Sequence, residues 1–393
     1  MLQRIRTRNY PMEDAQIEIR LNQGEYVGGD IIFGTVFVKA MGQLQSRTLK
    51  LQIRGYEKSS HQYNYTIALE GQDQYQTKTG KRQWEKVFLG EEFKMVEYPS
   101  ILCTKQAFML VFCTGGFPRG AFSFSFQYQL PHGVPGVFNI KEADSMDGSI
   151  KYSIAAYFTN PQPKQRLYAE VPLIVYDSLD CRNAHYPPSK LHSSDRVQYL
   201  VCLNRGSVHL STKLDKSAYL SDEDISINVD VDNQSSLDVS SVTFTFNRVL
   251  RFFGKDGERG ESELSDRVNF TPLVTQHHEA IPRGTKTSWT EIIKLKEVNK
   301  LPPNTSGSIV RCKYHIDIKL HCQYSLDIDQ VQQVIIKPHH NSSWVMWEQP
   351  DWLDDCTVVT VRAPLTVTRD LLSSSSFANV LSPRQGTLSR QLN

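Results

Sequence analysis

Alternation of apolar and polar side chains is the pattern that most constrains how this chain can fold. The longest example runs from Cys312 to Cys322, where apolar residues alternate with lysine, histidine and aspartate. A second run places Phe122, Phe124 and Phe126 on one side of the backbone, opposite serines and a glutamine. Successive side chains of a β-strand point to opposite faces, so both runs predict strands with one buried face.

Shorter alternating runs recur at 49–54, 225–232 and 242–246. No window of comparable length repeats apolar residues at helical spacing, so the helices that a parallel α/β sheet requires are missing. Gly, Pro, Asn and Ser separate the runs, which is typical of stacked antiparallel sheets. We therefore predict an all-β protein built of immunoglobulin-like antiparallel β-sandwiches.

A set of short motifs occurs twice in the same order, which indicates a duplicated domain. The matched pairs are Tyr26 to Ile31 with Tyr219 to Ile225, Leu130-Pro131 with Leu301-Pro302, and Gly148 to Tyr152 with Gly307 to Tyr314. The repeat is too long for a solenoid. A chain of 393 residues also exceeds the usual size of one core. We predict two tandem sandwiches.

The domain boundaries follow from composition. We predict an N-terminal sandwich over 12–180, a linker over 181–195 that contains Pro187 and Pro188, and a C-terminal sandwich over 196–368. Residues 369–393 are polar and lack alternation, so we predict a disordered tail.

Bulk properties favour a cytoplasmic protein. A formal net charge of +2 gives no field that would make nucleic acid or an anionic bilayer an obligatory partner. The N-terminus lacks the apolar run of a secretory signal, and no segment approaches the roughly 18 apolar residues of a membrane span. Seven cysteines, an odd number without any Cys-x-x-Cys pair, indicate reduced thiols. We expect no nucleic-acid partner and at most peripheral membrane association.

Motifs of catalysis are absent from the sequence. It contains no phosphate loop, dinucleotide fingerprint, serine-hydrolase elbow or zinc-protease motif, so we predict no enzyme activity and no cofactor. His315, Asp317 and His321 share a face of one predicted strand, but Lys319 stands between them and would repel a cation. We interpret this face as solvated and predict no metal site.

Four basic residues on or beside one predicted strand form the candidate partner-binding site. We call this set the basic strip; it consists of Arg47, Lys50, Arg54 and Lys58. Arginine and lysine give charge-assisted hydrogen bonds to phosphate and carboxylate groups. The strip therefore suits an acidic or phosphorylated tail, and the alternative is a charged face that only maintains solubility.

Two other segments carry candidate contacts. Arg4, Arg6 and Arg8 would favour an anionic membrane, but we interpret them as a disordered basic N-terminus. Trp344, Trp347 and Trp352 are interpreted as a plug at the bottom of the second sandwich, with a partner anchor as the alternative.

Five pieces of sequence, in order, resemble the arrestin superfamily, and its α-arrestin (arrestin-domain-containing) branch more than the receptor-desensitising arrestins. They are 24–38, 49–56, 122–131 continuing to 148–152, 219–236 and 301–320. The resemblance covers 12–368. It implies two curved sandwiches joined by a short hinge. It also implies an adaptor that binds the cytosolic tails of membrane proteins at the plasma membrane or endosomes and links them to sorting or ubiquitination machinery.

The sequence departs from the family in two respects. It has no Pro-Pro-x-Tyr motif for WW domains, so a ubiquitin ligase or coat component is expected to be reached indirectly. Asp30 resembles a member of the buried charge cluster of phosphate-activated arrestins, but no arginine partner can be identified. The alternative function is a cytosolic signalling scaffold or redox-responsive regulator, in which Cys181 would form a mixed disulfide.

Overall fold

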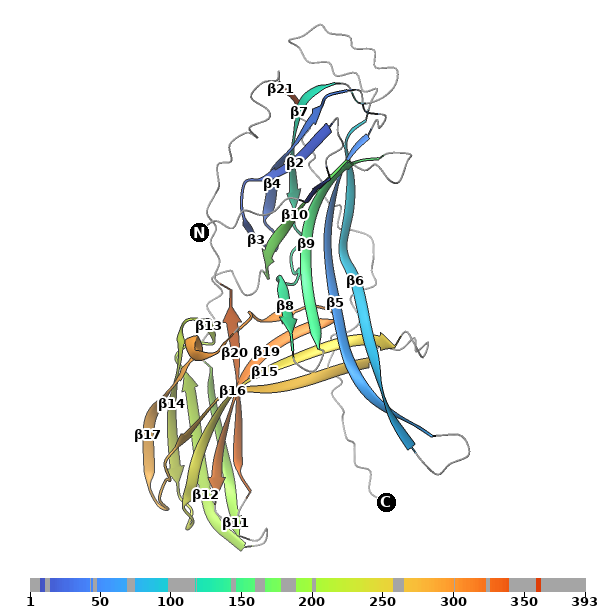
Figure 1. Cartoon of the computed structure of the whole chain (residues 1–393). Coiled ribbons are helices and arrows are strands. Elements are labelled where there is room, and N and C mark those ends of the chain that lie inside the picture. Colours follow the sequence, from blue (N-terminus) through green and yellow to red (C-terminus); the bar gives the residue numbers. More distant parts are fainter. Residues whose placement is uncertain are drawn as a thin grey trace, which may run out of the picture.

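The computed structural model confirms an all-β protein (Figure 1). It describes residues 8–10, 15–42, 44, 48–68, 75–97, 117, 119–142, 146–159, 167–177, 189–199, 203–256, 265–299, 301–322, 326–338 and 358–361. Within these ranges the only helix is the 3₁₀ turn η1 (Leu295–Glu297), so none of their helices could span a membrane.

The first sandwich packs two sheets against each other. One sheet has the order β2 (Ala15–Leu21), β4 (Ile31–Ala40), β7 (Gly120–Gln129) and β21 (Val358–Val361). The other has the order β1 (Arg8–Tyr10), β10 (Tyr168–Tyr176), β9 (Asp147–Phe158), β5 (Thr48–Ala68) and β6 (Tyr75–Glu97), with β3 (Glu25–Val27) beside β10 and β8 (Phe138–Lys141) beside β9. The β7 residues Phe122, Phe124 and Phe126 are buried between these sheets, as the alternation predicts.

The second sandwich repeats this plan. One sheet has the order β11 (Lys190–Tyr199), β12 (Leu203–Leu214), β14 (Asp224–Asn233) and β17 (Lys286–Lys294). The other has the order β16 (Ser265–His278), β15 (Val239–Asp256), β19 (Val310–Cys322) and β20 (Ile328–Lys337), with β13 (Ala218–Leu220) beside β20 and β18 (Thr305–Ser306) beside β19.

The duplicated motifs occupy equivalent places in the two sandwiches. β3 pairs in parallel with β10, as β13 does with β20, and each short strand buries a tyrosine, Tyr26 or Tyr219. The Tyr152 hydroxyl donates to the carbonyl of Pro135 at 2.5 Å, and the Tyr314 hydroxyl donates to that of Pro302 at 2.7 Å. Each of these bonds ties a central strand to the loop before it.

In both copies of the first repeat motif, the carboxylate four residues after the tyrosine binds the backbone. Asp30 Oδ2 accepts the backbone N–H of Val27 at 2.7 Å, and Glu223 Oε2 accepts that of Leu220 at 2.7 Å. The equivalent of Asp30 is therefore Glu223 and not Asp224. Both carboxylates bind the backbone of a turn between two strands, and among the described residues no arginine forms an ion pair with Asp30.

Three strands depart from the predicted boundaries. Strand β1 at Arg8–Tyr10 pairs with β10, so the first sandwich includes residues before 12 and the basic N-terminus is not wholly disordered. Strand β11 begins at Lys190, inside the predicted linker 181–195. Its polar edge-strand sequence lacks alternation, and the β12 ladder makes it a strand. Val358–Val361 was assigned to the second domain but pairs with β7 of the first. The predicted tail 369–393 and the tryptophan cluster lie outside the described residues.

A polar network closes one side of the second sandwich. Gln332 of β20 occupies a core-facing position and is fully buried. Its amide donates to Thr212 Oγ1 at 2.8 Å and its carbonyl accepts from Ser189 Oγ at 2.6 Å. Neighbouring Gln330 accepts from Thr212 Oγ1 at 2.6 Å. These hydrogen bonds join the two sheets. Because hydrogen bonds are directional and apolar contacts are not, they fix how the sheets are positioned relative to each other.

Replacing Gln332 by alanine is expected to lower the free energy of unfolding by about 2 kcal/mol, because the buried donors and acceptors it serves lose their partners. Gln333→Ala, on the exposed neighbour in the same strand, is the matched control and should change stability by less than about 0.5 kcal/mol. Urea titration followed by circular dichroism measures both. Equal effects of the two substitutions would show that the network contributes nothing specific.

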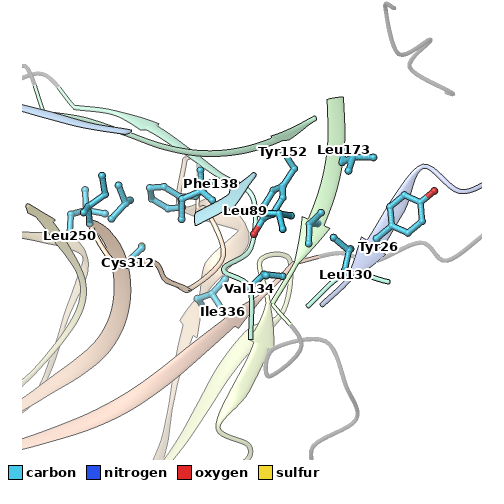
Figure 2. Close-up of a cluster of buried hydrophobic side chains, with 14 of the residues drawn as sticks. Tyr26, Leu89, Leu130, Val134, Phe138, Tyr152, Leu173, Leu250, Cys312 and Ile336 are labelled. Atoms are coloured by element: carbon cyan, nitrogen blue, oxygen red, sulfur yellow. The ribbon is translucent and has the colours of Figure 1, made fainter. Parts of the chain in front are cut away.

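One core continues from the first sandwich into the second. Figure 2 shows buried side chains running from Tyr26 and Leu173 through Tyr152 and Phe138 to Leu250. The 18 residues of β15 explain this continuity, because a strand of that length spans roughly 60 Å and exceeds one sandwich. Its first half packs within the second sandwich, and its second half packs against the first.

Candidate partner-binding face and domain junction

The described members of the basic strip share one face of β5. Lys50, Arg54 and Lys58 alternate with the buried residues Leu51, Ile53 and other core positions, so all three project to the outer face of the sheet. β5 lies between β6 and β9 and pairs with both, which holds these side chains on a rigid strand. Arg47 lies outside the described residues.

Carboxylates of β6 lie beside both lysines. Lys50 Nζ is 2.5 Å from Glu92 Oε1, and the Tyr157 hydroxyl of β9 also donates to Glu92. Hydrogen bonds from Lys50 and Tyr157 hold the pKa of the Glu92 carboxyl below its ordinary value. Lys58 Nζ is 3.7 Å from Glu85 Oε2. A partner anion must therefore compete with these two glutamates for the lysines.

Arg54 has different surroundings. Its neighbours across the ladders are Gly90 of β6 and Ser153 of β9, so small side chains flank the exposed guanidinium. The guanidinium lies 5.9 Å from the ring centroid of Tyr56 and forms no ion pair with any residue of the described strands. Among the described members of the strip, Arg54 is thus the one whose charge is available to a ligand.

The junction between the sandwiches contains a buried carboxylate. Glu57 of β5 is only 1% exposed. Its Oε2 accepts the backbone N–H groups of Ile309 at 2.7 Å and Val310 at 3.2 Å, and its Oε1 accepts the N–H of Ser308 at 2.9 Å and the Ser308 hydroxyl at 3.2 Å. Consecutive N–H groups that converge in this way form an anion-binding nest. The first domain thus supplies the anion and the second domain supplies the nest.

Two glycines, equivalent in the repeat, permit the close approach of the domains. A Cβ at Gly307 would lie 2.6 Å from Glu57 Oε2 and 2.7 Å from the Val310 carbonyl oxygen. A Cβ at Gly148 would lie 2.5 Å from the Phe252 ring. Each glycine therefore receives a side chain of the other domain. The duplicated Gly-Ser-Ile motif is consequently a junction motif in both copies.

Further polar contacts cross the same junction. The buried Arg248 guanidinium pairs with Glu142, which follows β8. The Ser59 hydroxyl donates to the Phe253 carbonyl, and Arg267 donates to the Gln62 carbonyl. Residues 82–83 of β6 also pair with 255–256 of β15. The two sandwiches therefore share one continuous sheet edge instead of only a flexible hinge.

The histidines and cysteines that were candidates for metal or redox chemistry have the following surroundings. His315 lies 3.2 Å from Asp317, and His321 lies 2.9 Å from Asp327. In the part of the chain that is described, no three histidine, cysteine or acidic side chains are arranged to hold a metal ion. Burial raises the pKa of Cys312 to about 12 and of Cys322 to about 11, so both thiols remain protonated and unreactive at neutral pH. Cys181 lies outside the described residues.

Sequence reasoning missed Glu57 and Arg248 as junction residues. Glu57 sits at a core-facing position of an alternating strand, and a charged residue at such a position is the one signal that could have revealed it. In the sequence, the Gly-Ser-Ile repeat indicates duplication but not a contact between the domains. No local pattern indicates that the two copies contact each other's domain.

Two family models of known proteins match this chain, one over each sandwich. The family model for the N-terminal domain of arrestin (or S-antigen) matches residues 15–181, and the model for the C-terminal domain matches 204–338. Arrestin domain-containing protein A of Dictyostelium discoideum is 27% identical over 223 residues, which are 56% of this chain and 35% of that relative. The match thus spans about a third of the relative's length. The chain belongs to the arrestin family.

Proposed function

We propose that this protein is an arrestin-type adaptor and that it binds acidic or phosphorylated cytosolic tails of membrane proteins on the outer face of β5. The observation that carries the proposal is Arg54, an exposed cation flanked by Gly90 and Ser153 on a central strand. A guanidinium offers a planar, bidentate fork for carboxylate and phosphate. Lys50 and Lys58 lie on the same face and supply further positive charge once a ligand displaces their glutamates.

The adaptor role extends the same proposal to sorting. Cargo held on the first sandwich would be linked to endocytic, endosomal or ubiquitination machinery through a further protein, because the chain has no Pro-Pro-x-Tyr motif. We place this activity in the cytoplasm, at the plasma membrane or endosomes. Family membership supports the adaptor role. The junction supports it too, because polar contacts between the sandwiches would keep the cargo-binding face of β5 at a constant distance from surfaces on the second sandwich.

Arg54→Glu is expected to weaken binding to phosphorylated tail peptides by about 10- to 100-fold, the loss that corresponds to a charge-assisted hydrogen bond. The measurement is fluorescence anisotropy with a panel of soluble tail peptides, phosphorylated and unmodified, in the absence of lipid. Added salt should weaken wild-type binding by screening.

Lys286→Glu is the matched control, because Lys286 is an exposed cation on β17 of the other sandwich. It should bind the peptides as the wild type does. If the Arg54 and Lys286 variants bind equally well, the strip is a solvated face and the proposal is wrong.

A further inference from the structure

The distal part of the β5–β6 hairpin extends beyond both sandwiches (Figure 1). We call it the β5–β6 ribbon and define it as 61–68 of β5 paired with 75–82 of β6. Its base is held by the contacts of Arg267 and β15, but beyond that base no other described strand pairs with it. A two-stranded hairpin alone in water is marginally stable at best. The ribbon therefore has the character of an element that is completed by a partner surface.

One face of the ribbon is aromatic and cationic. Tyr63 and Tyr65 lie along β5 with ring centroids 5.7 Å apart, and Ile67 continues the row. The Arg82 guanidinium covers the Tyr63 ring at 4.1 Å from its centroid, and Lys78 lies directly across from Tyr65. Gly80 lies opposite Tyr63, where a Cβ would come within 2.7 Å of the ring. The glycine thus lets the tyrosine ring lie flat across the ribbon.

The charge of the paired residues has one sign. They include Lys78, Lys81 and Arg82 and no carboxylate. Lys78 and Lys81 are exposed and form no ion pair with the described residues. Glu70 and Asp73 belong to the connection 69–74, outside the described residues. Lys78 and Arg82 share the face of Tyr63 and Tyr65, whereas Lys81, which pairs with Gln62, lies on the opposite face.

We propose that the aromatic face of the β5–β6 ribbon docks the protein on an anionic lipid bilayer. Tyrosine places its ring at the boundary of headgroups and acyl chains, and lysine and arginine beside it contact the headgroup phosphates. A ribbon that projects from the molecule can approach a planar bilayer, whereas a peptide would need a recess to enclose it. This inference goes beyond tail binding and does not depend on it.

The test is co-sedimentation of the full chain with cargo-free vesicles of phosphatidylcholine, with and without phosphatidylserine. The wild type should bind only the phosphatidylserine vesicles and be released by salt. Lys78→Gln should weaken this binding by about 5-fold, since a cation near an anionic surface contributes about 1 kcal/mol. Lys213→Gln combined with Lys286→Gln removes two exposed lysines of the second sandwich and should leave binding unchanged.

A second pair of variants separates the two faces of the ribbon. Tyr65→Ser should weaken vesicle binding several-fold, whereas Tyr75→Ser, on the opposite face and 78% exposed, should not. Equal binding to both kinds of vesicle, or unchanged binding of the Lys78 variant, would overturn the proposal. Loss of soluble tail-peptide binding in the ribbon variants, with vesicle binding intact, would instead make the ribbon a peptide surface. The peptide assay contains no lipid, so failure of tail binding at Arg54 would be recognised independently.

Discussion

Glu57→Ala is expected to lower the free energy of unfolding by about 3–5 kcal/mol. Three backbone N–H groups, of Ser308, Ile309 and Val310, lose their acceptor at once, and each buried donor left unpaired costs about 1–3 kcal/mol. Because those groups belong to the other domain, we expect one unfolding transition in the wild type and two in the variant. Urea denaturation, followed by tryptophan fluorescence and circular dichroism, measures both effects.

Hydrogen exchange gives a local reading of the same contact. The amides of Ile309 and Val310 should exchange faster in the Glu57 variant, while those of β14 should not change. Glu85→Ala is the matched control, because it removes an exposed carboxylate that lies 3.7 Å from Lys58 and should change stability by less than about 0.5 kcal/mol. A Glu57 variant that unfolds within about 1 kcal/mol of the wild type would show that the nest does not hold the domains together.

Glu142→Ala is expected to destabilise the protein by about 2–4 kcal/mol. It leaves the Arg248 guanidinium, whose side chain is 7% exposed, without its carboxylate in the junction. The value lies towards the low end for a buried pair because Glu142 itself is 23% exposed and water can partly replace it. Chemical denaturation of the purified full chain is the measurement.

The double variant Glu142→Leu with Arg248→Met is the decisive comparison. Apolar residues of similar size remove both charges and keep the packing, so stability should return to within about 1 kcal/mol of the wild type. The expected coupling energy between the two sites is then about 1–3 kcal/mol. Additive effects would mean that the pair is an accidental surface contact and that the junction depends on Glu57 and the glycines alone.

The junction has a consequence for an adaptor. The contacts of Glu57, Arg248 and the shared edge of β6 and β15 all connect the same two domains. The outer face of β5 and the β5–β6 ribbon belong to one continuous hairpin that also carries Glu57. The junction therefore positions both surfaces of this hairpin. Loosening the junction should weaken binding at the outer face of β5 and at the β5–β6 ribbon.

The all-β class, the duplication and the buried faces of the longer strands can be predicted from the amino-acid sequence alone. These properties are local, because a strand with one buried face must alternate, and the alternation of β7 and β19 is visible without knowledge of their neighbours. The duplication is visible because two copies of one fold need the same turn and core residues at the same positions. Lys50, Arg54 and Lys58 share a face for the same reason of periodicity.

The residues that join the domains and the ion pairs of the basic strip depend on long-range packing, so they become visible only in the folded protein. β11 and β21 are strands because of their hydrogen-bonded neighbours, and their short or polar sequences do not show it. Glu92 lies 42 positions from Lys50, and Ile309 lies 252 positions from Glu57. The local sequence around a carboxylate in a strand does not predict which N–H groups will donate hydrogen bonds to it. Those contacts depend on how two separately folded sandwiches pack against each other.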